Sequence, residues 1–107
     1  MTTAPKSEIL RIAELAAYQT GSVVSRQITK ADTGNVTLFA FDQDQELSEH
    51  TAPFDALVHI LDGEAEIKIS GKAFHLKMGE AIIMPANEPH AVRALSRFKM
   101  LLTMIRN

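Results

Sequence analysis

The sequence predicts an all-β fold, a sandwich or barrel of antiparallel strands behind a short N-terminal helical or irregular segment. From Val23 onward apolar and polar residues alternate with a period of two, the pattern of half-buried strands. Turn-forming residues interrupt this pattern at nearly even spacing, as in proteins built from many short strands. No strand–helix–strand rhythm occurs, so a parallel α/β sheet is disfavoured.

The first twenty residues follow a different pattern. Residues 1–6 are expected to form a disordered tail. Residues 7–20 are expected to form an N-terminal helical or irregular segment, and a short helix with Ser7 as its N-cap would end before Thr20. The basis is a set of apolar residues at helix-like spacing: Ile9, Leu10, Ile12, Ala13, Leu15 and Ala16.

Nine strands are expected in the barrel, at about residues 23–105, and the whole chain, 1–107, is expected to be one domain. The expected strands are residues 23–28, 35–42, 46–50, 56–61, 64–69, 73–76, 80–85, 90–95 and 98–105. The turns between them are signalled by residues 32–34 and 42–45, Pro53, Asp62-Gly63, Ser70-Gly71, Gly79 and residues 85–87.

Composition excludes several classes of function. The 107 residues are 46% hydrophobic and 22% charged, which argues against extended disorder. The net charge is -2 and the 11 Lys and Arg residues are scattered, so nucleic acid is not an expected partner. The absence of cysteine excludes thiol chemistry and disulfides. Arg11 and Glu14 interrupt the N-terminal apolar residues, so neither a signal peptide nor a membrane span is expected, and we expect a cytoplasmic protein.

Two spaced motifs carry a family resemblance. His50 precedes a proline-centred turn, and Gly63 closes the hairpin that follows; Gly79, Pro85 and His90 then occur within "GEAIIMPANEPHAV". This spacing resembles the two motifs of the cupin superfamily, over about residues 36–105. The first motif has a Gly, His-x-His, a Glu and a Gly, and the second has a Gly, Pro-x-Gly, a His and an Asn. The resemblance implies a single cupin-type jelly-roll β-barrel.

The sequence departs from this family pattern at its metal ligands. The resemblance implies a metal held by three His and one Glu, of which His50 and His90 remain. Ala52 stands at the second His, and Ala56 stands at the Glu. The other departures are Ala94 at the final Asn, Asp44 at the first Gly, and Asn87 at the Gly of Pro-x-Gly. The replacement of Gly by Asn at position 87 is expected to change the backbone conformation little, because Asn tolerates a positive φ.

The two alanines are expected to leave a roomier and more apolar pocket at the barrel mouth, with Phe54, Met84, Met100 or Met104 as possible lining. Both His50 and His90 are expected there, as metal ligands or as ordinary hydrogen-bonded histidines. A metal, if bound, would be zinc, nickel, iron or copper, held weakly because two imidazoles do not fill a coordination shell.

The remaining acidic and histidine side chains have smaller expected roles. Glu49 is expected to point away from the face of His50, whereas Glu46, four residues before His50, could share that face as a third ligand. His59 is expected on the outer face of its strand, and His75 is expected to be a partly exposed strand residue.

Two classes of function remain open from the sequence. The first is a barrel that binds a small, mostly apolar ligand or a weakly held transition metal. The second is a metal-dependent cupin enzyme, an oxygenase or isomerase of a small molecule, which would use His50 and His90. No catalytic residue is assigned and no organic cofactor is expected. A homodimer is expected because residues 98–105 are almost continuously apolar and because Leu57, His59 and Leu61 form an outward face.

Overall fold

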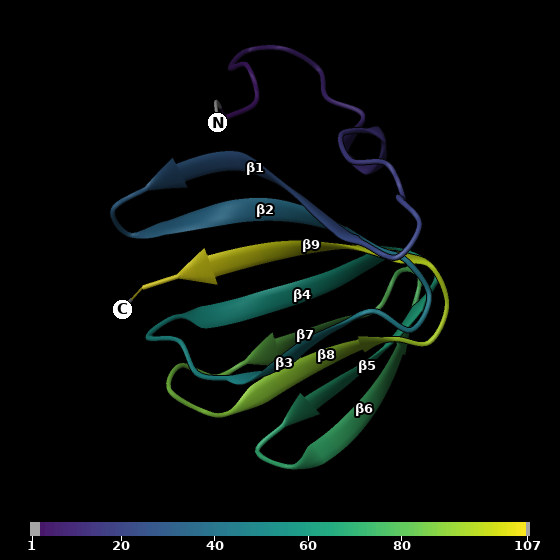
Figure 1. The fold of residues 1–107 in the computed structure, drawn as a ribbon. Coiled ribbons are helices and arrows are strands. Elements are labelled where there is room, and N and C mark those ends of the chain that lie inside the picture. The colour runs from purple at the N-terminus through teal and green to yellow at the C-terminus, as the bar shows by residue number, and fades with distance from the viewer. Residues whose placement is uncertain (1–2, 107) are drawn as a thin grey trace.

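The computed structural model describes residues 3–106, and nine strands account for most of that range (Figure 1). One 3₁₀ turn, η1 (Ile12–Glu14), precedes the strands. The strands are β1 (Val23–Ala31), β2 (Gly34–Phe41), β3 (Glu46–His50), β4 (Asp55–Asp62), β5 (Glu64–Ile69), β6 (Lys72–Lys77), β7 (Ala81–Met84), β8 (His90–Ala94) and β9 (Phe98–Ile105). The all-β prediction is confirmed, and each expected strand is present with small shifts of its ends.

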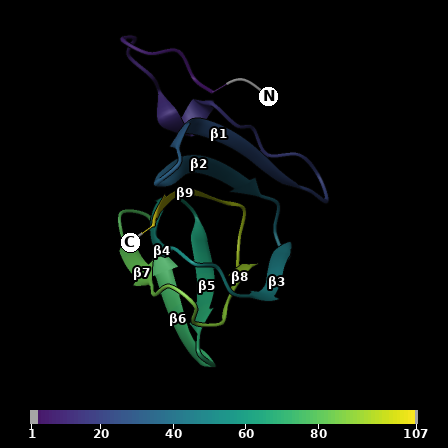
Figure 2. The same ribbon diagram turned by 90° about the vertical axis from the view of Figure 1, so that its left-hand side faces the viewer.

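The strands form two sheets in a jelly-roll order. The larger sheet has the order β1-β2-β9-β4-β7, and the smaller sheet has the order β3-β8-β5-β6. Each pairing within these sheets is antiparallel. Figure 2, turned by 90° from Figure 1, shows the two sheets on either side of a common interior. That interior holds the main core: Phe41, Ala56, Val58, Ile60, Ala65, Ile67, Leu76, Met84, Val92, Ala94, Phe98 and Met100.

The N-terminal segment is mostly irregular, one of the two expected forms, and the short helix expected to start at Ser7 is not formed. Only Ile12–Glu14 are helical, and Ser7, the expected N-cap, has a positive φ of 61°. A helix this short is marginal by itself, so packing decides its conformation. Here the segment lies against the outer face of the larger sheet (Figure 1). Within residues 3–106 no helix is long and apolar enough to cross a membrane.

A second, smaller core joins this segment to the sheet. Ala4 and Ala16 are buried against three buried residues of β1 and β2, and several partly buried neighbours complete the cluster. The backbone N–H of Ala4 donates to the Ile28 carbonyl, at 2.9 Å. Ala4 therefore packs, although residues 1–6 are expected to be disordered; residues 1 and 2 lie outside the described residues. The three sheet residues are Ile28, Leu38 and Ala40.

The N-terminal segment covers only part of the outer face of the larger sheet. Leu61 and Leu101 pack in the second core. Further along the same face, Leu57, Ile83 and Ile105 are exposed. They are close together because Leu57 is opposite Ile83 in the β4–β7 pairing and the neighbouring Asp55 is opposite Ile105. We call Leu57, Ile83 and Ile105 the outer patch.

Candidate functional site

A cavity of about 280 Å³ lies between the two sheets. It is at the barrel end where β3 finishes and where β4 and β8 begin. Its lining residues are Phe39, Leu47, His50, Ala52, Ala56, Met84, His90, Val92, Met100, Leu102 and Met104. Among these described lining residues the two histidines are the only polar side chains. The cavity is therefore apolar along its walls and polar at one place.

Three of the four residues expected to line the pocket do line the cavity. Met84, Met100 and Met104 line the cavity, whereas Phe54 does not. Phe54 lies in the turn before β4, where its ring is covered by the Arg106 guanidinium, 4.7 Å from the ring centroid. The expectation for Phe54 is thus wrong: its ring makes a cation–π contact with Arg106 and does not line the cavity.

Two alanines help to form the cavity. Ala52 and Ala56 both line it, and the family pattern has a His and a Glu at these places. Two hydrogen bonds join the turn that carries Ala52 to the turn that contains Ala86 and Asn87. The Ala52 carbonyl accepts from the Asn87 N–H at 2.8 Å, and the Asp55 carboxylate accepts from the Ala86 N–H at 2.9 Å. Asn87 takes a positive φ of 65° in this second turn.

His50 and His90 meet at the polar end of the cavity. Their Nε2 atoms are 3.1 Å apart, and the rings are nearly perpendicular, at 70°. His90 is buried, with 6% of its surface exposed, whereas His50 is an exposed residue. One imidazole is thus fixed in the interior and the other faces both cavity and solvent.

The other ring nitrogen of each histidine is bound to the backbone. Nδ1 of His50 is 2.7 Å from the Ser48 carbonyl oxygen, and Nδ1 of His90 is 3.2 Å from the Glu88 carbonyl oxygen. A carbonyl oxygen only accepts, so each Nδ1 carries the proton of its neutral ring. When both rings are neutral, both Nε2 atoms therefore present lone pairs to each other across 3.1 Å. A proton on Nε2 of His50, a hydrogen-bond donor from a ligand, or a cation bridges the two nitrogens.

A β-bulge brings His50 to this position. Leu47 is paired with Val92 and His50 with His90, so Ser48 and Glu49 together stand opposite Ala91. In a regular strand, residues three apart face opposite sides. The extra residue lets both Leu47 and His50 line the cavity.

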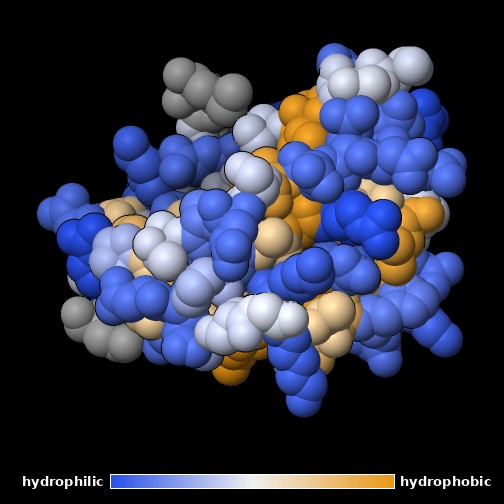
Figure 3. Space-filling view, turned by 60° about the horizontal axis from the view of Figure 1, so that its bottom comes forward, coloured by the Kyte–Doolittle hydropathy of each residue, from blue (hydrophilic) through white to orange (hydrophobic). Residues whose placement is uncertain are grey.

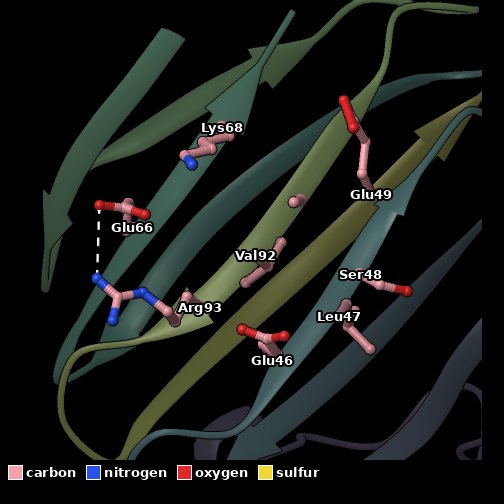
Figure 4. A pocket seen from close by; sticks show the side chains of 9 residues that line it. Glu46, Leu47, Ser48, Glu49, Glu66, Lys68, Val92 and Arg93 are labelled. Carbon is pink, nitrogen blue, oxygen red and sulfur yellow. Dashed lines mark ion pairs between the residues drawn. The ribbon is translucent and has the colours of Figure 1, made fainter. Parts of the chain in front are cut away.

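The same bulge puts Glu46 on the outside, beside Glu49, which points away from His50 as expected. Glu46 is paired with Arg93 and, like Glu49, lines a groove on the outer face of the smaller sheet (Figure 4). The expectation that Glu46 could serve as a third ligand is therefore wrong, because it assumed an unbroken alternation. The groove has a volume of about 240 Å³ and contains the Arg93–Glu66 ion pair, at 3.7 Å. Figure 3 shows this side of the molecule covered mainly by polar side chains.

The structure separates the other two histidines from the cavity. His59 lies on β4 between residues that face the core, and it is not among the lining residues. His75 is exposed on β6, where its Nε2 is 2.7 Å from Glu64 Oε1. Neither histidine is among the described lining residues, and neither forms a metal-binding group with the His50–His90 pair within residues 3–106.

The pair provides two ligand positions for a metal. With metal–nitrogen bonds of about 2.1 Å, two imidazole nitrogens on one ion lie about 3.0 Å apart at a right angle and about 3.4 Å apart at the tetrahedral angle. The Nε2–Nε2 distance of 3.1 Å falls in this interval. The Nδ1 contacts to carbonyls orient both rings as in known metal sites. Among residues 3–106, however, no group of three or more His, Cys, Asp or Glu side chains is placed to hold a metal.

The buried histidine is held in its neutral form. Burial is the main cause that lowers the pKa of His90, the charge of His50 lowers it further, and the Glu88 carbonyl opposes this by a smaller amount. Nε2 of His90 therefore keeps its lone pair to lower pH than a free imidazole does.

Comparison with known proteins identifies a family for this fold and motif arrangement. The family model of the cupin domain matches residues 37–106. A conserved protein of unknown function from Streptococcus pyogenes is 31% identical, over 100% of this chain and 96% of that one, with a TM-score of 0.91. A cupin superfamily protein from Desulfitobacterium hafniense is 28% identical, over 99% and 97%, with a TM-score of 0.90.

A third solved structure is longer than this chain. The cupin 2 conserved barrel domain protein from Leptotrichia buccalis is 40% identical over 91% of this chain, with a TM-score of 0.88, and the match covers 47% of that protein. Comparison with curated proteins finds no match.

Proposed function

This chain belongs to the cupin family, and on that premise we propose that its barrel binds a small, mostly apolar ligand. The observation that carries the proposal is the apolar cavity of about 280 Å³, in which two imidazoles are the only polar side chains among the described lining residues. Its volume is near the lower end of ligand pockets, which begin at about 300 Å³. An apolar cavity of about 150 Å³ is enough for benzene.

Toluene should bind in this cavity. We expect it to shift the methyl resonances of Met84, Met100 and Met104, which line the cavity, and to leave that of the exposed Met78 unchanged. Ala56→Leu should abolish these shifts because the larger side chain fills the cavity. Ala91→Leu, the same substitution on the outer groove, is the matched control and should bind toluene as the parent does. An NMR titration in which toluene shifts none of the three lining methyl groups would contradict the proposal.

A weakly held transition metal is the second candidate, and the spacing of the two Nε2 atoms favours it. His50 and His90 would hold zinc, nickel, iron or copper in two adjacent positions, and water or a bound molecule would complete the shell. Such a metal would supply Lewis-acid or redox chemistry, as an oxygenase or isomerase requires. The protein's part would be to orient both imidazoles through the Ser48 and Glu88 carbonyls and to exclude water with the apolar walls.

We also propose that the protein is a cytoplasmic homodimer that associates through the outer patch. The N-terminal segment covers the neighbouring part of the same sheet, so the patch is the portion of this face left without cover in the described residues. A closed two-fold pairing would bury Leu57, Ile83 and Ile105 against their copies. Light scattering at micromolar concentration should give the mass of a dimer, and the mass of a monomer would count against this proposal.

A further inference from the structure

The hydrogen-bonding state of the two imidazoles restricts the polar group that a ligand can bring. Both Nδ1 atoms are next to backbone carbonyls, so both Nε2 atoms of the neutral pair are acceptors. The Nε2 of His90 is the one that is hard to satisfy with solvent, because only 6% of this residue is exposed. Its polar contact is with Nε2 of His50, at 3.1 Å, which in the neutral pair is also an acceptor. A buried acceptor that faces another acceptor and no donor is costly. A ligand that donates a hydrogen bond at this point is therefore favoured over one that only accepts.

The charges of the lining restrict the ligand further. The described lining residues include no Lys, Arg, Asp or Glu. A carboxylate ligand would bring a negative charge and two further acceptors, with no fixed cation beside it. An ammonium ligand would bring a positive charge with no carboxylate beside it. Burying an unpaired charge is far more costly than burying a hydrogen-bonded hydroxyl. The donor is therefore a neutral group, and a hydroxyl is the smallest neutral group that supplies it.

The walls favour a flat aromatic body. Three thioethers line the cavity, from Met84, Met100 and Met104, and the Phe39 ring adds an aromatic surface. Sulfur–aromatic and aromatic–aromatic contacts are both favourable beyond the area that they bury. The volume of about 280 Å³ accommodates one ring with small substituents.

We propose that this cavity takes a monocyclic phenol whose ring lies among the three methionines and whose hydroxyl donates to Nε2 of His90. This assignment rests on the proposed function, the binding of a small, mostly apolar ligand in the same cavity. It adds the ligand's class, a neutral aromatic hydroxyl compound, and it makes His90 the residue that determines specificity.

The test compares p-cresol with p-xylene, which has a methyl group in place of the hydroxyl and nearly the same shape. Dissociation constants are measured by NMR in the presence of EDTA, so that no metal contributes. Because the two probes differ in hydration, the quantity compared is their affinity ratio in each variant. In His90→Leu we expect the preference for p-cresol over p-xylene to fall by about tenfold, the value of one net hydrogen bond. His75→Leu, on the outer face, should keep the ratio of the parent.

Three results would overturn the assignment. The first is an affinity ratio that His90→Leu leaves unchanged. The second is a p-toluate affinity above that of p-cresol, which would mean that the pair receives anions. The third is binding of p-xylene with no p-cresol binding; here the proposed function stands and the phenol assignment fails. If neither neutral probe binds, the proposed function itself fails. Retained p-xylene binding in His90→Leu shows that this variant keeps its cavity and makes the ratio meaningful.

Discussion

Nickel binding should be lost when either His50 or His90 is replaced by Ala. With two protein ligands the parent is expected to bind nickel or zinc weakly and to release it on dialysis against a mild chelator. Removing one imidazole leaves a single ligand, which cannot hold the ion. Binding by the parent should also weaken in acid as His90 takes up a proton, at a pH below the free-imidazole value of about 6.5, because burial lowers the pKa of His90. Isothermal titration of the parent and both variants measures each of these effects.

Three matched variants test whether the loss is specific. His59→Ala, His75→Ala and Glu46→Ala each remove a possible ligand outside the cavity, so nickel binding should stay as in the parent. The reverse experiment restores the family pattern: Ala52→His combined with Ala56→Glu should tighten binding strongly, because four ligands would then surround the ion. If His50→Ala binds nickel as well as the parent, the metal candidate is wrong.

Gly63→Ala should cause a large loss of stability. Gly63 connects β4 to β5 with a φ of +73°, and a Cβ at this position would overlap the Arg97 carbonyl oxygen. Both the backbone strain and the overlap with main-chain atoms must be relieved by moving the start of β9. We expect a cost of about 3 kcal/mol or more, a large part of the stability of a small domain. Urea unfolding followed by circular dichroism measures this cost.

Gly71→Ala separates strain from overlap. Gly71 has a similar φ of +83°, and a Cβ there would meet nothing within 4 Å. This variant should lose only about 1–2 kcal/mol, the cost of the left-handed conformation for an L-residue. Equal losses in the two variants would show that the approach of Arg97 to Gly63 is not tight in solution.

The strands could be predicted because their signals are local. Alternation and turn residues are read within a few positions, and they located each of the nine strands. Some strands are longer than their sequence pattern predicts because pairing with a neighbour extends them. For example, β1 continues to Ala31 because its last residues pair with the start of β2. The sequence does not decide between a helical and an irregular N-terminal segment, because its apolar spacing fits a helix but its apolar residues pack on the outer face of the sheet without one.

The two histidines could be predicted from the motif spacing, but their surroundings could not. Strand alternation put Glu46 on the face of His50, and the bulge at Ser48 and Glu49 reverses that assignment. A usable signal was present: Leu47 and His50 both suit the interior but are three residues apart, which requires a bulge. The contacts of each Nδ1 with a carbonyl two residues earlier depend on side-chain geometry, which periodicity does not encode.

The position of β9 has a consequence for the making of the protein. This strand is separated from β2 by more than half of the chain, yet it lies between β2 and β4 and pairs with both. During synthesis, the edges of β2 and β4 that pair with β9 stay unpaired until Phe98–Ile105 has left the ribosome. Folding is thereby completed after translation of the barrel, and pairing between distant segments makes it slow. Nascent chains that stop before Phe98 would expose both edges and are expected to aggregate or be degraded.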